Sequence, residues 1–340
     1  MGKKKFSVAV VGVGMVGKKM VEILLERRFP CKSLKVLATR RREEIISGEK
    51  FMVEETTADS FQGIDIAFFA GTEGEKGAGK AFARQAAVRG TVVIDNGSDF
   101  RMDPDVPLVV PEVNPQALKN HHNLIANPNC STIQMVMVLA PLHQAFGLKR
   151  VIVSTYQAVS GTGRQAVEEL NRQIHAYISG NALSGEVYPH PIAFNILPQI
   201  GTLSEEFPGY YTEEVKMIKE TRKIMVLPEL LVSATCVRVP VFNGHCESLT
   251  VELEKEATPE QAREILRKSP GIQVVDAPEK SEYPLPVRAS GSDDVLVGRI
   301  RRNPAFPHGL DIWVAADNIR KGAALNAVQI AEEMLRQGLL

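Results

Sequence analysis

The sequence predicts an α/β protein in which a doubly wound domain is joined to a second domain of the α+β class. Over roughly the first 130 residues short apolar strands alternate with helices, which is typical of a parallel sheet covered on both faces. After Pro128 the pattern changes to longer helices and separated strands. The length of 340 residues suits two domains, since one domain takes ~150 residues. We expect residues 1–130 with 321–340 to form the first domain and 131–320 the second.

The first domain opens with a strand, a glycine turn and a helix. Phe6–Val11 is apolar, Gly12–Gly17 is glycine-rich, and Met20, Ile23 and Leu24 then lie on one helical face. Ile64–Ala70 is almost unbroken in its apolarity, as expected for a strand buried on both faces. Further strands are predicted at Leu34–Thr39, Thr91–Asp95, Leu108–Val110 and Asn123–Ala126, and a helix at Ala78–Val88.

The second domain begins with a long apolar helix from Ser131 to about Phe146. Asn243-Gly244 lies between two strand-like segments and predicts a hairpin that joins antiparallel strands. The last segment, Lys321–Gln337, has apolar residues at helical spacing, and we expect this helix to pack on the first domain. The remaining elements are predicted as strands at Val151–Gln157, Ser233–Val239 and Ser248–Glu254, a glycine turn at Gly161–Gly163, and a helix at Arg164–Ile178.

Composition excludes several classes of protein. Forty basic side chains balance forty acidic ones, so an extended nucleic-acid surface is not expected. Apolar runs fall short of the ~20 residues that cross a bilayer, so no membrane span is predicted. The four cysteines are scattered without a CxxC pair, which excludes a disulfide scaffold and indicates a cytoplasmic protein without a predicted metal site. Three of them, Cys31, Cys236 and Cys246, are interpreted as small buried apolar residues.

The glycine turn has the form GxGxxG directly between a strand and a helix. Such a turn lets the backbone approach a pyrophosphate, whose charge is favoured by the unpaired N–H groups at the helix start. A Rossmann-type dinucleotide site is therefore predicted, and the alternative is a tight turn without a ligand. The residues expected to bind the cofactor here are Gly12, Val13, Gly14, Met15, Val16 and Gly17.

The end of the second strand favours NADP over NAD. An NAD site usually places a carboxylate there to bind the ribose, whereas this chain has Thr39 followed by arginines. A hydroxyl and guanidinium groups at Thr39, Arg41 and Arg42 suit a 2′-phosphate. The alternative is that these arginines only pair with Glu43 and Glu44.

Cys130 is the candidate nucleophile. It lies in Asn127–Thr132, immediately before the apolar helix, where unpaired N–H groups and the helix dipole stabilise a thiolate. The same N–H groups can bind the oxyanion of a tetrahedral intermediate. A thiolate beside a nicotinamide indicates acyl transfer to sulfur followed by hydride transfer to the thioester.

These residues resemble the aspartate-semialdehyde dehydrogenases, and the resemblance runs from the first strand to the last helix. It implies NADPH-dependent reductive dephosphorylation of L-aspartyl 4-phosphate to L-aspartate 4-semialdehyde, in the biosynthesis of lysine, threonine, methionine and isoleucine. It also implies a homodimer or homotetramer built through the second domain. The matching segments are Asn127–Thr132, Tyr156–Gly161, His190–Asn195, Glu213–Lys216, Thr235–Pro240, Gly244–Ser248 and Trp313–Gly322.

The resemblance assigns roles to individual residues. Cys130 resembles the acyl-thioester nucleophile, His245 the acid–base residue with a near-neutral pKa, and Gln157 the active-site glutamine. A bidentate guanidinium suits the α-carboxylate of the substrate. The residues implied for the substrate are Arg238 for the α-carboxylate, Glu213 for the ammonium group, and Arg101 with Lys216 for the phosphate; those implied near the nicotinamide are Ser160, Gly161 and Asn318.

The sequence departs from the family pattern in three places. The glycine turn is one residue shorter than the family's usual turn, Gly71–Glu75 replaces a serine-rich loop, and Asn96–Asp99 replaces the usual run of small residues. The nearest alternative is a related N-acetyl-glutamyl phosphate reductase, but Glu213 would then face an uncharged acetylated amine. Glyceraldehyde-phosphate dehydrogenase shares the chemistry but not the segments above. A catalytically silent nucleotide-binding relative would tolerate loss of Cys130 or His245, yet both are present.

Overall fold

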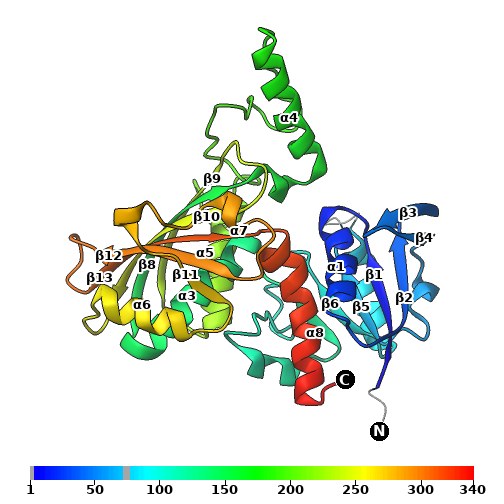
Figure 1. Cartoon of the computed structure of the whole chain (residues 1–340). Helices are drawn as coiled ribbons and strands as arrows, with labels where there is room; N and C mark the ends of the chain where they lie inside the picture. The colour runs from blue at the N-terminus through cyan, green and yellow to red at the C-terminus, as the bar shows by residue number, and fades with distance from the viewer. Residues whose placement is uncertain (1–3, 72–76) are drawn as a thin grey trace. The chain divides into compact units, whose positions relative to one another are not determined.

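The structure of the chain is a computed structural model that describes residues 4–71 and 77–340 (Figure 1). It divides into two compact units, unit 1 from Met1–Asn129 with Ala323–Leu340, and unit 2 from Cys130–Gly322. Within the described ranges no helix has the length and apolarity needed to cross a bilayer. The same ranges contain no group of three or more histidine, cysteine, aspartate or glutamate side chains arranged to hold a metal ion.

Unit 1 contains a seven-stranded sheet in the order β3-β4-β2-β1-β5-β6-β7. Neighbouring strands are parallel except β3 and β4, which form an antiparallel pair at one edge. The order reverses its direction on either side of β1, as in doubly wound folds. The strands are β1 (Phe6–Val11), β2 (Cys31–Ala38), β3 (Arg42–Ile46), β4 (Glu49–Glu55), β5 (Ile66–Phe69), β6 (Val92–Asp95) and β7 (Leu124–Ala126).

Helices cover this sheet and share its apolar core. The terminal helix α8 packs on α1 and on β6, and α2 packs on β5, β6 and β7. Val10, Phe68 and Val328 are fully buried together, which explains why the central strands read as continuous apolar runs. The helices are α1 (Met15–Glu26), α2 (Ala78–Val88) and α8 (Leu325–Gln337), with 3-10 turns η1 (Ala58–Phe61) and η2 (Pro115–Asn120).

The predicted strand, glycine turn and helix at the start of the chain are confirmed, but two details of unit 1 differ. Leu108–Val110, predicted as a strand, contributes only a bridge between Leu108 and Ala126. The hairpin of β3 and β4 is not predicted, because its exposed edge position leaves it rich in charged residues. Charged residues on an edge strand discourage pairing with another sheet, but they hide the strand in a hydrophobicity pattern.

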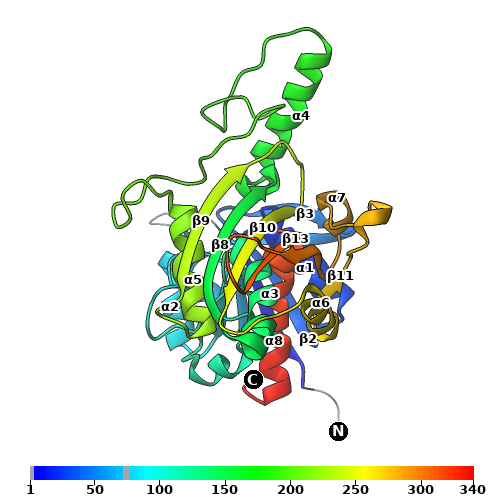
Figure 2. The same cartoon turned by 90° about the vertical axis from the view of Figure 1, so that its left-hand side faces the viewer.

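Unit 2 contains a six-stranded mixed sheet in the order β11-β12-β13-β10-β8-β9. Helices α3, α5 and α6 pack on it and α3 contacts both of the others, so one face of the sheet is covered (Figures 1 and 2). The α/β domain followed by an α+β domain is the fold class predicted from the sequence. The strands are β8 (Leu148–Gln157), β9 (Leu231–Arg238), β10 (His245–Leu253), β11 (Ile272–Val274), β12 (Val295–Arg302) and β13 (Gly309–Ala316).

The remaining elements of unit 2 are helical. Almost every side chain of α3 between Ser131 and Leu142 is buried, so this helix lacks a polar face. Helix α4 and the long segment after it extend beyond the end of the sheet in both views (Figures 1 and 2). The elements are α3 (Cys130–Phe146), α4 (Arg164–Ile178), α5 (Thr212–Met225), α6 (Pro259–Lys268), α7 (Pro286–Ala289), the 3-10 turns η3 (Val159–Thr162) and η4 (Pro278–Lys280), and the π-helical turn η5 (Arg320–Ala324).

The predicted hairpin at Asn243-Gly244 is wrong. β9 and β10 do not pair with each other, because β8 lies between them, parallel to β9 and antiparallel to β10. The connection crosses the end of β8, where the N–H groups of Val159 and Ser160 donate to the carbonyls of Val241 and Phe242. An Asn-Gly pair with a positive φ at the glycine fits this crossing as well as a hairpin turn, so local sequence does not distinguish them.

Candidate active site

Three predicted site residues stand at one edge of the unit 2 sheet because three neighbouring strands begin or end there. Gln157 is the last residue of β8 and Arg238 the last of β9, and the two are paired in register. His245 is the first residue of β10, whose next residue pairs with Tyr156 of β8. All three side chains are buried, so their positions are set by the register of the sheet.

His245 is held in one tautomer. The main-chain N–H of Ala158 donates to Nδ1 of His245 at 3.0 Å, so the neutral ring must carry its proton on Nε2. Among the described residues Nε2 has no hydrogen-bond partner. Burial, and then the charge of Arg238, lower the pKa of His245 well below its usual value, which corrects the near-neutral pKa expected from sequence. The ring is therefore a neutral hydrogen-bond donor.

Gly161 permits the close approach of His245 and Arg238. A Cβ at this position would lie 2.9 Å from Nη1 of Arg238 and 3.0 Å from Nε2 of His245. Nη1 of Arg238 donates to the carbonyl of Ala158 at 2.8 Å. Its Nε has no partner among the described residues, which leaves a buried donor beside the histidine. A donor of this kind suits an anionic ligand.

Gln157, Glu213 and Lys216 form a second part of the same cluster. Nε2 of Gln157 donates to Oε1 of Glu213 at 3.2 Å and to the hydroxyl of Thr155 at 3.3 Å. Lys216 lies one turn further along α5 and pairs with Glu213 at 3.8 Å. Since α5 packs on β9, the helix brings an acidic and a basic side chain to the strand ends.

Cys130 is the first residue of α3, at the helix end where main-chain N–H groups lack partners within the helix. Its side chain is half-buried. A Cβ at Gly322 would lie 2.9 Å from Cβ of Cys130, and the N–H of Gly322 donates to the carbonyl of Asp317 at 2.9 Å. Cys130 and Gly322 therefore lie too close together for a side chain at position 322.

Asn318 binds the loop between β9 and β10. Its amide oxygen accepts from the N–H of Gly244 at 2.9 Å, and its amide nitrogen donates to the hydroxyl of Ser160 at 2.9 Å. Asn243 donates to the neighbouring Asp317 at 3.0 Å. The structure thus joins the predicted residues Ser160 and Asn318 directly.

The other cysteines differ from Cys130 in their surroundings. Cys236 and Cys246 are buried, and burial raises the pKa of the Cys236 thiol well above its usual value and that of Cys246 to about 12. Burial also raises the pKa of Cys31 to about 11. All three are uncharged thiols near neutral pH and poor nucleophiles.

The glycine turn of unit 1 has the geometry that a dinucleotide requires. Gly12 has a φ of +98°, and a Cβ at Gly17 would lie 1.8 Å from the carbonyl oxygen of Gly12, so neither position accepts a side chain. Helix α1 starts after Gly14 without a side-chain cap and without an acidic residue in its first turn. The free N–H groups at this helix start can bind a pyrophosphate.

Of the residues predicted for the 2′-phosphate, Thr39 and Arg41 are exposed, whereas Arg42 starts β3. Nε of Arg42 donates to Glu44 at 2.8 Å, and Lys18 donates to the other oxygen of Glu44 at 2.7 Å. These bonds, first from Lys18 and then from Arg42, lower the pKa of Glu44. Arg42 is thus paired with Glu44, as the alternative interpretation expected, and Arg41 projects into solvent.

Arg101 belongs to unit 1, where its Nη2 donates to the carbonyl of Asn96 at 2.8 Å and its side chain is buried. Of the loop Gly71–Glu75, only Gly71 lies within the described residues.

Some residues that shape the site are not predicted from the sequence. Ala158 acts through its main chain and has no sequence signal, whereas Asn243 is assigned to a hairpin turn and Gly322 is only part of a matching segment.

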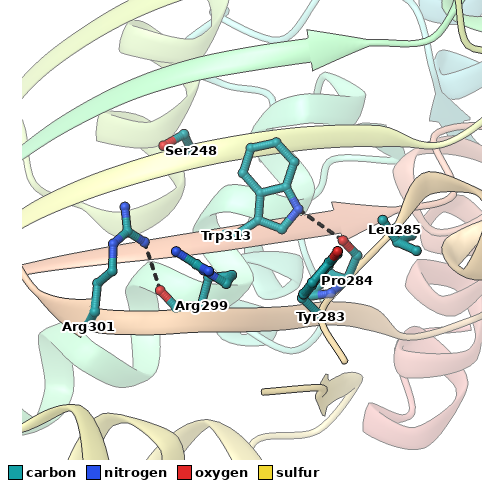
Figure 3. Close-up of a pocket in the computed structure, with 7 residues that line it drawn as sticks. All are labelled: Ser248, Tyr283, Pro284, Leu285, Arg299, Arg301 and Trp313. Atoms are coloured by element: carbon teal, nitrogen blue, oxygen red, sulfur yellow. Dashed lines mark hydrogen bonds between the residues drawn. The ribbon is translucent and has the colours of Figure 1, made fainter. Parts of the chain in front are cut away.

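A cavity of about 380 Å³ lies elsewhere in unit 2 (Figure 3). None of the predicted site residues lines it. Its walls come from β10, β12, β13 and the segment before α7, and Nε1 of Trp313 donates to the carbonyl of Pro284 at 3.0 Å. The lining residues are Ser248, Tyr283, Pro284, Leu285, Arg299, Arg301 and Trp313.

Two family models match the chain. The semialdehyde dehydrogenase NAD binding domain matches residues 7–121, and the semialdehyde dehydrogenase dimerisation domain matches residues 139–321. Aspartate-semialdehyde dehydrogenase of Aquifex aeolicus is 51% identical over 343 aligned positions, with 98% of this chain and 99% of the relative covered. That of Bacillus subtilis is 45% identical over 345 positions, with 98% of each covered.

Solved structures give the same result. Aspartate semialdehyde dehydrogenase II from Vibrio cholerae has a TM-score of 0.92 and 42% identity, and the match covers 98% of this chain and 99% of that one. The same values hold for its complex with ASA. These comparisons confirm the resemblance found in the sequence motifs and identify the chain as an oxidoreductase with a nucleotide-binding and a dimerisation domain. The chain belongs to the aspartate-semialdehyde dehydrogenase family.

Proposed function

We propose that the chain catalyses the NADPH-dependent reductive dephosphorylation of L-aspartyl 4-phosphate to L-aspartate 4-semialdehyde, through a thioester on Cys130. The observation that supports this most strongly is the cluster at the strand ends of unit 2. There a neutral histidine, a buried guanidinium and a carboxylate bound to an amide stand together at His245, Arg238, Glu213 and Gln157. This combination suits a substrate with an α-carboxylate, an ammonium group and a reacting carbonyl.

Cys130 supplies the nucleophile. Its thiolate, stabilised at the start of α3, attacks the acyl carbon of the substrate; a C–S bond forms, the C–O bond to phosphate breaks, and inorganic phosphate leaves. NADPH, when bound, supplies the hydride that reduces the carbonyl carbon of the resulting thioester. The alkoxide takes a proton from His245 and returns it as the C=O bond re-forms and the C–S bond breaks, so that the aldehyde leaves and the thiolate is restored.

His245 and Gln157 act on the oxygen of the reacting carbonyl and on its position. The Nε2 proton of His245 is available to the alkoxide oxygen, since Nδ1 is already bound by Ala158. Gln157 fixes the carboxylate of Glu213 and keeps it directed at the substrate. An amide does this without changing the charge of the site.

The charged residues bind the substrate. Arg238 is assigned to the α-carboxylate, because a planar guanidinium can donate two parallel bonds to it. Glu213 is assigned to the ammonium group, and Lys216 with Arg101 to the phosphoryl group. A related substrate with an acetylated amine would bring no ammonium group to the buried carboxylate of Glu213, so the interaction assigned to it would be lost.

The cofactor residues are assigned in unit 1 and at the sheet edge of unit 2. The turn Gly12–Gly17 fits a pyrophosphate, and Thr39, Arg41 and Arg42 are assigned to the 2′-phosphate of NADP. Ser160, Gly161 and Asn318 are assigned to the neighbourhood of the nicotinamide. The dimerisation domain supports a homodimer or homotetramer.

The test is the phosphate-dependent reduction of NADP by the purified protein with L-aspartate 4-semialdehyde. Parallel reactions use NAD as the cofactor and N-acetyl-glutamate 5-semialdehyde as the substrate. We expect turnover with the first aldehyde, dependence on phosphate, preference for NADP, and no turnover by Cys130→Ala, which should still bind NADPH. Preference for the acetylated aldehyde, or turnover by Cys130→Ala, would contradict the proposal.

A further inference from the structure

Glu247 is a carboxyl group that the proposed reaction does not use. It is fully buried as the third residue of β10, between Thr155 of β8 and Val314 of β13. Side chains two positions apart in a strand share a face, so Glu247 points to the same face of the sheet as His245. Burial raises the pKa of Glu247 well above its usual value. A carboxyl group in this place is held in its neutral form.

Gln134 faces Glu247 from helix α3. The amide of Gln134 interacts with the carboxyl group of Glu247. This interaction lowers the pKa of Glu247, whereas burial raises it more strongly. Gln134 is buried and lies one helical turn after Cys130, so the two share a face of α3. Helix α3 packs on β10, and the first residues of these two elements are Cys130 and His245.

No other described group satisfies this pair. Both carboxyl oxygens of Glu247 and both amide atoms of Gln134 lack a partner of hydrogen-bond geometry within residues 4–71 and 77–340. The hydroxyl of Thr155, which is paired in register with Glu247, accepts from Gln157 and makes no hydrogen bond to Glu247. Burial and the amide of Gln134 are what shift the pKa of Glu247, and neither is a cation. Buried polar groups are rarely left unpaired, so these two side chains must satisfy each other.

We propose that Glu247 and Gln134 form a neutral acid–amide pair that positions the start of α3 against the start of β10, and thereby Cys130 against His245. The carboxyl O–H donates to the amide oxygen, and the amide N–H donates to the carboxyl oxygen. An ionised carboxylate would leave the amide oxygen facing a negative charge instead. Glu247 is thus a positioning residue, and this inference rests on the proposed function of Cys130 and His245.

The test compares Glu247→Gln with Glu247→Leu. An amide at position 247 can form the same two bonds with Gln134, so Glu247→Gln should keep kcat within about twofold and keep the pH midpoint of Cys130 alkylation by iodoacetamide. Glu247→Leu leaves the Gln134 amide buried and unpaired and frees α3 to shift. We expect its kcat to fall ~100-fold with KM unchanged, since small misplacements of reacting groups have effects of this size. Peptide mass spectrometry separates alkylation of Cys130 from that of the other thiols.

Two further variants distinguish positioning from stability alone. In Glu247→Leu with Gln134→Leu neither polar group is left unpaired, so the denaturant midpoint should recover while kcat stays low. Leu249→Ala, on the same face of β10 and equally buried, should lower the denaturant midpoint and leave the alkylation midpoint unchanged. Recovery of kcat in the double variant, or an equal loss of kcat in Leu249→Ala, would show that the pair contributes stability only and would overturn the proposal.

The protonation state is tested without reference to catalysis. If Glu247 is neutral when folded, the folding equilibrium constant of the wild type falls up to tenfold per pH unit relative to Glu247→Gln above pH ~4.5. A constant ratio across pH, or a shift of the Cys130 alkylation midpoint by a unit in Glu247→Gln, would mean that Glu247 is ionised and would overturn the pair. Activity with the semialdehyde, and its loss in Cys130→Ala, test the proposed function separately.

Discussion

The main-chain N–H of Ala158 is 3.0 Å from Nδ1 of His245 and donates a hydrogen bond to it. Because a main-chain N–H can only donate, the ring nitrogen that it meets can only accept, and the neutral imidazole keeps its proton on Nε2. In the proposed reaction His245 therefore acts as a donor to oxygen. The proposal attributes the thiolate of Cys130 to the start of α3 and does not require His245 to take up the thiol proton first.

Replacing His245 by glutamine and by asparagine tests which ring nitrogen acts. The amide nitrogen of glutamine reaches the position of Nε2, and that of asparagine reaches only the position of Nδ1. We expect His245→Gln to retain some stabilisation of the oxyanion and His245→Asn to lose it, with kcat lower in both by ~100-fold or more because neither transfers a proton. Single-turnover kinetics measures the difference; equal rates for the two variants would count against Nε2 as the acting atom.

The buried His245 also predicts how stability depends on pH. Its pKa is lowered in the folded protein, so the unfolded chain binds a proton at higher pH than the folded one does. Stability is therefore complete above the usual value of 6.5 and is lost as the pH falls toward the pKa of the folded state. The loss should reach about 1.4 kcal/mol per pH unit relative to His245→Gln. Urea unfolding between pH 5 and 8 measures this slope, and parallel curves for the two proteins would contradict it.

Arg238→Lys tests the binding of the α-carboxylate. One guanidinium nitrogen is already bound to the carbonyl of Ala158, so a lysine ammonium cannot serve both that carbonyl and a carboxylate with two parallel bonds. We expect KM for the semialdehyde to rise about tenfold or more, since a charge-assisted bond contributes ~1.5–3 kcal/mol. Arg302→Lys is the matched control, because Arg302 is an exposed arginine of the same sheet, paired with Glu256. An unchanged KM in Arg238→Lys would remove Arg238 from the substrate site.

The preference for NADP is tested by Arg41→Ala and Arg42→Ala, alone and together. Arg41 is exposed and available to a 2′-phosphate, whereas Arg42 must share its charge with Glu44. We expect the double variant to narrow the ratio of kcat/KM for NADPH over NADH by about tenfold or more. Arg40→Ala, in the same exposed segment, should leave the ratio unchanged. If the double variant keeps the wild-type ratio of kcat/KM for NADPH over NADH, the residues that select NADP lie elsewhere.

The sequence predicts those parts of the fold that local pattern decides. The apolar run Phe6–Val11 followed by glycines, and the helices Ala78–Val88 and Arg164–Ile178, coincide with elements of the structure. Which strands pair with each other depends on the whole sheet and not on local sequence. For this reason Asn243-Gly244 predicts a hairpin turn that the structure does not contain. The sequence does not predict the edge hairpin Arg42–Glu55, because its exposed side chains are mostly charged and give no regular alternation of apolar and polar residues.

For the candidate site, the sequence could indicate residue types and segments but not contacts. Gln157, Arg238 and His245 match family motifs in the sequence, whereas their shared sheet edge follows from the strand order. The bond from Ala158 to His245 involves no side chain of Ala158, so no sequence pattern reports it. Glu247 lies in the matching segment Gly244–Ser248 but receives no role there, because burial of a carboxyl group is a property of the packed sheet.

The close approach of Gly322 to Cys130 has a practical consequence for protein engineering. A single methyl group there would lie 2.9 Å from Cβ of Cys130, closer than side-chain carbons normally approach. Variant libraries aimed at the last turn before α8 should therefore keep this position as glycine. Alanine, usually the mildest substitution in a helix, would here displace the first residue of α3.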